Sequence, residues 1–279
     1  AQQLDVTMDL VCFDLDGTLL NESSQISPFT RETLALMRSK NIAYTVATGR
    51  TMLSAKNIIQ GHDFDLPQVY NNGVTVWHPE QEQMTLDNLL GEGEIATVLN
   101  KALSLGITPF VHAIQDHHHL IYHPAPRHDV ERTLIDKHYS ITHAKLFALE
   151  ALPADANVTN ISMIGEPALV EGMWEEVLAH PNLVAYSGPA MEGKQFRWMD
   201  IHHCLANKGT ATTQLKAQLG ASNLICFGDS DNDRTMFEQS DECYAPANAK
   251  EPIKALASQV IGFNYEDGVA HFLRERFSL

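Results

Sequence analysis

The feature that most constrains the fold is a short, mainly apolar segment, Asp9–Phe13, that runs directly into Asp14-Leu15-Asp16-Gly17-Thr18. Side chains alternate along a strand, so Asp14 and Asp16 are expected to point to the same side at its carboxyl end. Two neighbouring carboxylates repel one another unless a cation or a reaction compensates them. Gly17 lets the backbone turn sharply beside a ligand. The segment therefore predicts a buried strand that ends in a functional site.

Strand-like segments followed by amphipathic helices recur at both ends of the chain. Apolar strands that alternate with helices indicate a parallel sheet covered on both faces, which binds its ligands where the strands end. We therefore expect a doubly wound α/β core. Its predicted strands are 9–13, 43–47, 68–70, 224–227, 243–245 and 260–262, and its predicted helices are 28–39, 51–60, 209–219, 231–238, 251–257 and 268–277.

The middle of the chain has a different pattern. Stretches of alternating polarity, typical of half-exposed antiparallel strands, lie at 119–123, 160–164 and 196–201, between amphipathic segments at 94–105, 127–138 and 169–178. This pattern predicts a second, α+β domain inserted into the first. The expected domains are a discontinuous core of residues 1–81 and 201–279, and an insert of residues 82–200.

The charge balance limits the partners. The 279 residues include 19 basic and 35 acidic side chains, a net charge of -16. Such a surface disfavours binding to nucleic acid or to anionic membranes. No apolar run reaches transmembrane length, and the N-terminus does not resemble a secretion signal. Cys12, Cys204, Cys226 and Cys243 are dispersed, so we expect reduced thiols, not zinc ligands or disulfides, in a cytoplasmic protein that is a monomer or small homo-oligomer.

Three further segments carry chemically useful side chains at predicted strand ends or helix starts. Residues 48–50, Thr-Gly-Arg, offer a hydroxyl, exposed amides and a helix N-terminus for an anion. Lys208-Gly209 adds a positive charge, and residues 228–233, Gly-Asp-Ser-Asp-Asn-Asp, are rich in the hard oxygen ligands that Mg²⁺ prefers. A carboxylate can also act as a covalent nucleophile. Together the segments indicate phosphoryl transfer, in which positioning and charge neutralisation provide most of the catalysis.

The segments resemble the motifs of a known family. D-x-D-G-T at 14–18, T-G-R at 48–50, K-G at 208–209 and G-D-x-x-N-D at 228–233 are similar, in order and spacing, to those of the haloacid dehalogenase (HAD) superfamily. The insert, with N-G at 72–73 just before it, resembles the C2-type cap of Cof-like phosphatases. The resemblance covers essentially the whole chain. It implies a HAD-like core with an inserted cap and a Mg²⁺-dependent phosphatase activity.

The resemblance also implies roles for individual residues. Asp14 would be the nucleophile, and Asp16 the general acid that protonates the leaving alcohol and then activates water. Asp14, the backbone carbonyl of Asp16 and Asp229 would hold Mg²⁺, with Asp233 joining directly or through water. The groups expected near the phosphoryl oxygens are Thr48, Lys208, Asn232 and the amides of Leu15 and Gly49.

Other side chains keep more than one interpretation. Arg50 either contacts the phosphate or braces the acidic loop. Asp231 is explained by its place in a first helical turn. The run His117-His118-His119 would be either a solvated loop or edge strand, which we favour, or a transition-metal site. Polar residues of the insert that qualify to contact a substrate are His112, Asp116, His117, His118, His119 and Arg197.

The expected function is hydrolysis of small phosphate monoesters, such as sugar phosphates or phosphorylated cofactors, through an aspartyl-phosphate. A phosphomutase would use the same aspartyl-phosphate and return the phosphoryl group to the substrate. A non-catalytic phosphometabolite-binding protein would be expected to lack one of the key groups, and all of them are present here. The sequence does not indicate the physiological substrate.

Overall fold

The computed structural model describes residues 8–140, 142 and 144–279, which fold as two compact units. The first unit comprises the described residues up to Asp87 together with Asn207–Leu279, and the second lies within Asn88–Ala206. The domain limits at 82 and 200 remain a prediction. The first unit extends to Asp87 because β5 (Gln83–Leu86) pairs with β4 (Thr75–His78).

The first unit is built on a parallel sheet, as predicted. Its five strands lie in the order β14-β13-β12-β1-β2, and every neighbouring pair is parallel. Beyond β2, β3 joins through one parallel bridge between Ala47 and Val69 and continues with β4 and β5 as an antiparallel sheet. The strand bounds are β1 (Asp9–Phe13), β2 (Ala43–Val46), β3 (Gln68–Tyr70), β12 (Asn223–Phe227), β13 (Glu242–Pro246) and β14 (Gln259–Ile261).

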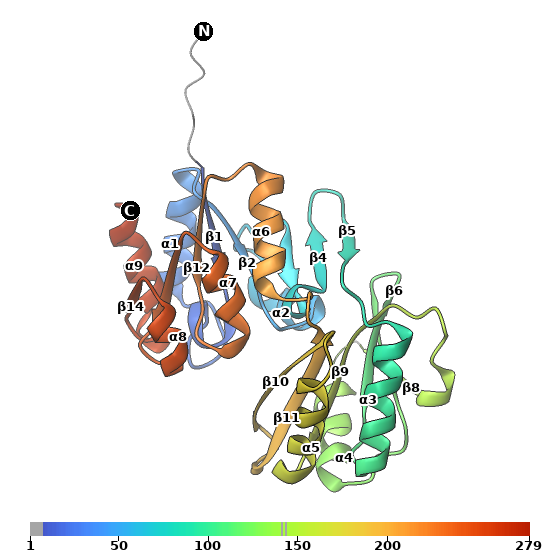
Figure 1. The fold of residues 1–279 in the computed structure, drawn as a ribbon. Coiled ribbons are helices and arrows are strands. Elements are labelled where there is room, and N and C mark those ends of the chain that lie inside the picture. The colour runs from blue at the N-terminus through green and yellow to red at the C-terminus, as the bar shows by residue number, and fades with distance from the viewer. Residues whose placement is uncertain (1–7, 141, 143) are drawn as a thin grey trace. The chain divides into compact units, whose positions relative to one another are not determined.

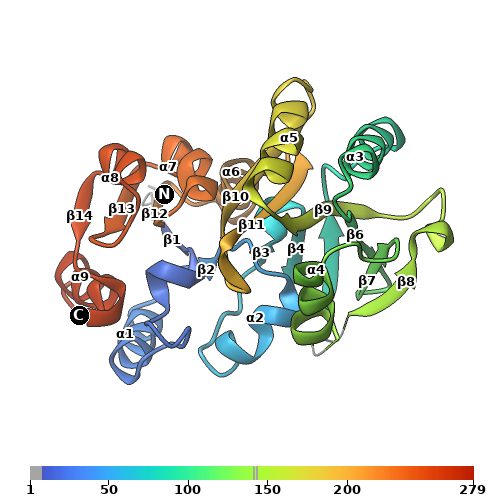
Figure 2. The same ribbon diagram turned by 90° about the horizontal axis from the view of Figure 1, so that it is seen from below.

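Helices cover both faces of this sheet (Figure 1, Figure 2). Side chains of α1 (Pro28–Ser39), α2 (Met52–Ile59) and α9 (Gly268–Arg276) pack with Phe13 on one face. Those of α6 (Lys208–Leu219), α7 (Arg234–Gln239) and α8 (Glu251–Leu256) pack with Cys12 on the other. Because neighbouring residues of β1 pack against opposite faces of the sheet, the strand is apolar from Leu10 to Phe13. The arrangement is the doubly wound core that the sequence predicts.

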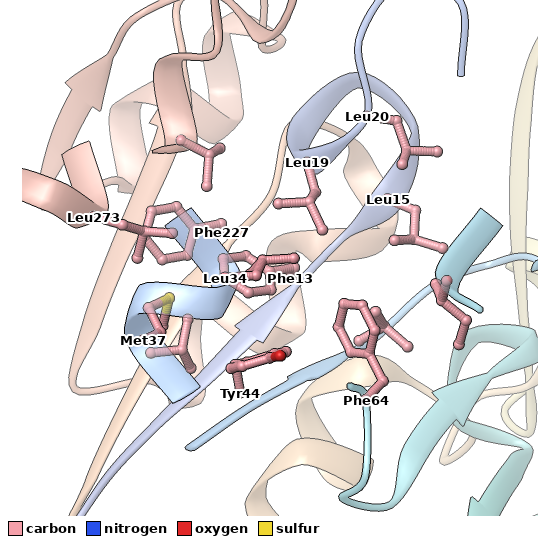
Figure 3. Packing of buried hydrophobic residues seen from close by; sticks show 14 of the residues in the cluster. Phe13, Leu15, Leu19, Leu20, Leu34, Met37, Tyr44, Phe64, Phe227 and Leu273 are labelled. Atoms are coloured by element: carbon pink, nitrogen blue, oxygen red, sulfur yellow. The ribbon is translucent and has the colours of Figure 1, made fainter. Parts of the chain in front are cut away.

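The core beneath the functional loops is aromatic and aliphatic (Figure 3). The rings of Phe13 and Phe227 lie 5.4 Å apart, in one cluster with Leu34 of α1 and Leu273 of α9. Burial of each such side chain contributes about 1.5–3 kcal/mol. Leu15, in the turn that follows β1, is also fully buried in this cluster. The turn that carries the acidic residues is therefore anchored in the core.

The second unit contains a six-stranded sheet in the order β10-β11-β9-β6-β7-β8. Its neighbouring strands are antiparallel except for β7 and β8. Helices α3 (Glu92–Leu105) and α5 (Pro167–Leu178) pack on one face of the sheet, and α4 (Asp129–Leu134) packs on the other. The unit is therefore α+β, as predicted. Its strands are β6 (Phe110–Gln115), β7 (His118–His123), β8 (Lys145–Ala148), β9 (Val158–Gly165), β10 (Leu183–Ala190) and β11 (Gly193–His203).

Within the described residues, every helix is too short or too polar to cross a membrane.

Candidate active site

The acidic segments meet at the carboxyl ends of β1 and β12. Asp14 directly follows β1, and Asp229 lies two residues beyond the end of β12. Gly17 has a left-handed φ of 75°, and a Cβ atom there would lie 2.4 Å from Oδ2 of Asp229. The Thr18 hydroxyl donates a hydrogen bond of 2.8 Å to Oδ1 of Asp229. The turn after β1 therefore packs directly against the second acidic loop, and glycine is needed at position 17.

A buried lysine connects the carboxylates. Oxygen atoms of Asp14, Asp229 and Asp233 all lie within 4.8 Å of one another. The Nζ atom of Lys208, whose side chain is 0% exposed, lies 3.0 Å from Oδ1 of Asp14 and 2.7 Å from Oδ1 of Asp233. Lys208 is the first residue of α6, and the side chain of Asn207 caps that helix by accepting a hydrogen bond from the Thr210 amide. Residues almost two hundred positions apart in the sequence thus form one charged cluster.

The cluster carries excess negative charge. Burial and the charge of Asp233 raise the pKa of Asp14, although Lys208 opposes the shift. Burial and Asp233 likewise raise the pKa of Asp229. For Lys208, burial lowers the pKa, but the charges of Asp14 and Asp233 outweigh it and raise the pKa above its ordinary value. Three carboxylates facing one ammonium, all with hard oxygen donors, fit a divalent cation such as Mg²⁺.

Asp233 differs from the other two carboxylates because groups of the protein already bind both of its oxygens. Oδ1 pairs with Lys208, and Oδ2 accepts hydrogen bonds from the amides of Asp229 (2.9 Å) and Ser230 (3.1 Å). A Cβ atom on Gly228 would lie 2.5 Å from Cγ of Asp233, so the loop closes tightly around this carboxylate. Asp233 thereby shapes the loop that presents Asp229.

The predicted anion-binding groups lie on the neighbouring loop after β2. Thr48 is 1% exposed, and its Oγ1 accepts a hydrogen bond of 3.0 Å from the Arg50 amide, which leaves its hydroxyl hydrogen available. Within the described chain, the Gly49 amide donates no hydrogen bond. The Leu15 amide, in contrast, donates to Oδ1 of Asp14 at 2.8 Å. This amide therefore orients the Asp14 carboxylate in this structure.

Arg50 pairs with Asp16. Its Nε and Nη2 atoms lie 2.6 and 2.8 Å from the two carboxylate oxygens of Asp16, and its Nη1 donates to the Ser54 carbonyl at 3.2 Å. The hydrogen bond to Asp16 and, less strongly, its charge raise the pKa of Arg50. The Asp16 side chain is 50% exposed and is not a member of the Asp14 cluster. Of the two interpretations of Arg50, the structure shows the bracing one.

Two asparagines at the site were not identified from the sequence as functional residues. Asn72, after β3, accepts a hydrogen bond of 3.0 Å from Nδ2 of Asn232. Asn248, after β13, donates a hydrogen bond of 2.8 Å to the Gly17 carbonyl. The turn residues Asn72-Gly73 were a sequence signal for the first. Asn248 had no signal, because its partner lies 231 residues away.

The favoured interpretation of the histidine run is wrong for His119. Strand β7 is not an edge strand, because β8 pairs with it, and Nε2 of His119 lies 2.8 Å from Nδ1 of the buried His112. Burial lowers the pKa of His119 to about 4 and, with the charge of His119, that of His112 to about 3. His117 and His118 lie at the hairpin turn, where Asp116 also has positive φ. In the described part of the chain, no group of three possible metal ligands includes a histidine.

Comparison with known proteins agrees with this geometry. A family model described as haloacid dehalogenase-like hydrolase matches residues 11–273. The chain is similar to the putative phosphatase YxeH of Bacillus subtilis, 26% identical over 276 residues, which cover 95% of this chain and 97% of the relative. It is 28% identical over 289 residues to the 5-amino-6-(5-phospho-D-ribitylamino)uracil phosphatase YitU of Bacillus subtilis, covering 97% and 98%. A solved haloacid dehalogenase-like hydrolase from Bacillus subtilis superposes with a TM-score of 0.78 at 23% identity, covering 96% and 99% of the two chains.

Proposed function

We propose that this chain, which belongs to the haloacid dehalogenase-like hydrolases, hydrolyses small phosphate monoesters with Mg²⁺ through an aspartyl-phosphate. It is an enzyme of the phosphatase class of that family. The observation that carries the proposal is the buried Lys208, which bridges Asp14 and Asp233 beside Asp229. Relatives are named phosphatases of 5-amino-6-(5-phospho-D-ribitylamino)uracil and of pyridoxal phosphate. Sugar phosphates and phosphorylated cofactors are the proposed substrate classes.

Asp14 is oriented for nucleophilic attack. The Leu15 amide and Lys208 both bind Oδ1, while Oδ2 accepts no hydrogen bond from the described residues. In the first step, an Asp14 oxygen forms a bond to phosphorus and the bond from phosphorus to the ester oxygen breaks. In the second step, water attacks the aspartyl-phosphate, which releases inorganic phosphate and restores the carboxylate. Lys208 stabilises the negative charge in both steps.

The proposed Mg²⁺ ligands are Asp14, the backbone carbonyl of Asp16 and Asp229. Asp233 acts through the loop or through water, because Lys208 and two amides already bind its oxygens. Bound Mg²⁺ would neutralise charge on the phosphoryl oxygens. Thr48 and the Gly49 amide, with unused hydrogen-bond donors, are the proposed contacts to those oxygens, together with Lys208 and Asn232.

Asp16 is the proposed general acid and base, and Arg50 regulates its position. Both carboxylate oxygens of Asp16 are bound to the guanidinium of Arg50, whereas a general acid must reach the leaving oxygen. The pair must therefore open before Asp16 can protonate the leaving oxygen. We assign Arg50 the role of holding Asp16 until the substrate is in place.

Hydrolysis of a chromogenic phosphate ester, measured with Mg²⁺ and with excess chelator, tests the proposal. Asp14→Asn should lower turnover by about 10³-fold or more, because it removes the nucleophile. The matched control is Asp231→Asn, in the same region but paired with the exposed Lys250, which should keep near wild-type activity. Unchanged turnover in Asp14→Asn would contradict the mechanism. A screen of phosphorylated metabolites should release free phosphate, whereas an isomerised sugar phosphate would identify a phosphomutase.

We also propose that the enzyme acts in the cytoplasm. Cys12, Cys226 and Cys243 are free thiols and are buried. Free thiols fit a reducing compartment, where phosphorylated metabolites are made and used.

A further inference from the structure

The loop between β3 and β4 has an unusual backbone. Asn71, Asn72 and Gly73 have φ values of 50°, 54° and 98°, so three consecutive residues are left-handed. Glycine adopts this conformation without steric cost, whereas asparagine pays for it and is chosen where its side chain has a use. Strained backbone of this kind clusters at functional sites, where the surrounding structure holds it in place.

The loop is fixed between two segments of the active site. The Asn71 amide donates to the Arg50 carbonyl at 2.9 Å, and the Asn72 amide donates to the Thr48 carbonyl at 3.1 Å. On the other side, a Cβ atom on Gly73 would lie 2.4 Å from the carbonyl oxygen of Asn207, the residue before Lys208. Asn72 therefore lies between the loop that carries Thr48 and the start of the helix that carries Lys208.

The Asn72 side chain is buried and only partly bonded. It is 4% exposed, and its Oδ1 accepts the hydrogen bond from Asn232. This bond fixes which end of the amide faces Asn232 and turns Nδ2 elsewhere. A Cβ atom on Gly49 would lie 3.2 Å from Oδ1 and 3.4 Å from Nδ2 of Asn72, so the amide packs directly against the loop with the unused Gly49 amide. Among the described residues, no acceptor binds Nδ2 of Asn72.

We propose that Asn72 is a substrate-contacting residue whose Nδ2 donates a hydrogen bond to a phosphoryl oxygen. This inference rests on the proposed function and adds a residue to its phosphate site. Nδ2 of Asn72 is not one of the buried polar atoms that lack a partner, so it is accessible to solvent and free to meet a ligand. An anion bound beside Thr48 and Gly49 gives it a charged acceptor, which makes a stronger hydrogen bond than a neutral one. The contact is to the phosphoryl group, so it serves every ester regardless of the leaving alcohol.

The test compares Asn72→Gly with Asn71→Gly. Both substitutions tolerate the left-handed backbone, but only the first removes the amide beside Gly49. For Asn72→Gly we expect kcat/KM to fall about 10- to 100-fold, the range for a hydrogen bond to a charged group, and by a similar factor for esters of different alcohols. The inhibition constant for inorganic phosphate should rise in parallel. Asn71→Gly should stay within about twofold of wild type, and thermal unfolding should show that both variants fold.

A double-mutant cycle separates direct contact from support of Asn232. If Asn72 contacts phosphate, Asn72→Gly lowers phosphate affinity further in an Asn232→Ala background; if it acts only through Asn232, the second substitution adds nothing and the proposal is overturned. Unchanged phosphate inhibition in Asn72→Gly alone overturns it as well. Calorimetric titration with inorganic phosphate and Mg²⁺ keeps this test independent of turnover. A wild-type protein that binds phosphate but hydrolyses no ester would refute the proposed function and leave the role of Asn72 measurable.

Discussion

Asp229→Asn should stabilise the metal-free protein while it abolishes activity. In the structure, Asp229 shares its site with Asp14 and Asp233, and the ammonium of Lys208 contacts those two carboxylates. Among the described residues, Asp229 has two hydroxyl donors, Thr18 and Ser230, but forms no ion pair with a cationic side chain. Without Mg²⁺, the charge of Asp229 therefore destabilises the folded state.

The size of the effect follows from the distances. Two unit charges 4.8 Å apart, the limit for this cluster, repel by about 3 kcal/mol at an effective dielectric constant of ~20. An asparagine keeps one acceptor oxygen and loses the other, so the hydrogen bond from one hydroxyl weakens at a cost of about 1 kcal/mol. The expected net gain in the free energy of unfolding is about 2 kcal/mol in chelator.

Urea unfolding at neutral pH, in chelator and in Mg²⁺, measures this gain. Mg²⁺ should stabilise the wild type by mass action and the Asp229→Asn variant much less. In Mg²⁺, the difference in free energy of unfolding between the two proteins should therefore shrink or change sign. The raised pKa of Asp229 means that the folded state holds its proton to higher pH than the unfolded state does. The advantage of the variant should therefore shrink as the pH is lowered towards the ordinary range of a carboxyl group. A variant less stable than wild type in chelator would refute the reasoning, and Asp231→Asn serves as the control.

Two other predictions concern Gly17, in the turn after β1, and Glu242, in β13. Gly17→Ala should remove Mg²⁺-dependent stabilisation and most activity, because its Cβ would lie 2.4 Å from Oδ2 of Asp229; Gly61→Ala, with a similar left-handed φ and nothing within 4 Å, is the control for backbone strain alone. Glu242→Gln should flatten the acid limb of the stability profile. Hydrogen bonds from Arg276 lower the pKa of Glu242 from 4.5 to about 2, so its stabilising contribution is complete above about pH 4.5 and is lost as the pH falls towards 2. An acid unfolding curve identical to that of wild type would contradict this assignment.

The strands of the core were predictable because parallel strands buried on both faces are continuously apolar. Strand β1 has the predicted bounds, and β12 begins one residue earlier than expected, at Asn223. The half-exposed strands of the second unit were harder to identify. Strand β6 was missed, since His112 and Gln115 interrupt its apolar pattern, and burial of His112 depends on partners from other strands. Sequence periodicity cannot report such cross-strand pairing.

The active site also has features that the sequence predicts and features that only the structure reveals. The rule that ligands bind at the carboxyl ends of parallel strands brings together Asp14 and Asp229, and the structure agrees. The sequence does not predict which partner each side chain binds. Arg50 could reach a phosphate or Asp16, and only the position of α2 relative to β1 decides in favour of Asp16. From the sequence, Asn72 resembles an ordinary turn residue, and only the structure shows its contact with Asn232.

The charges of the site explain how so acidic a chain can bind an anion. The net charge is -16, and the cations at the site, Lys208 and Arg50, are already paired with Asp14, Asp233 and Asp16. A phosphate dianion entering the metal-free site would meet more carboxylate than ammonium charge. Bound Mg²⁺ would cancel that excess negative charge, and by linkage a bound phosphate would strengthen Mg²⁺ binding by the same factor. In the proposed mechanism, the acidic cluster therefore selects for metal and substrate together. The proposed neutral donors of Thr48, Gly49 and Asn72 would contribute hydrogen bonds without changing the net charge of the site.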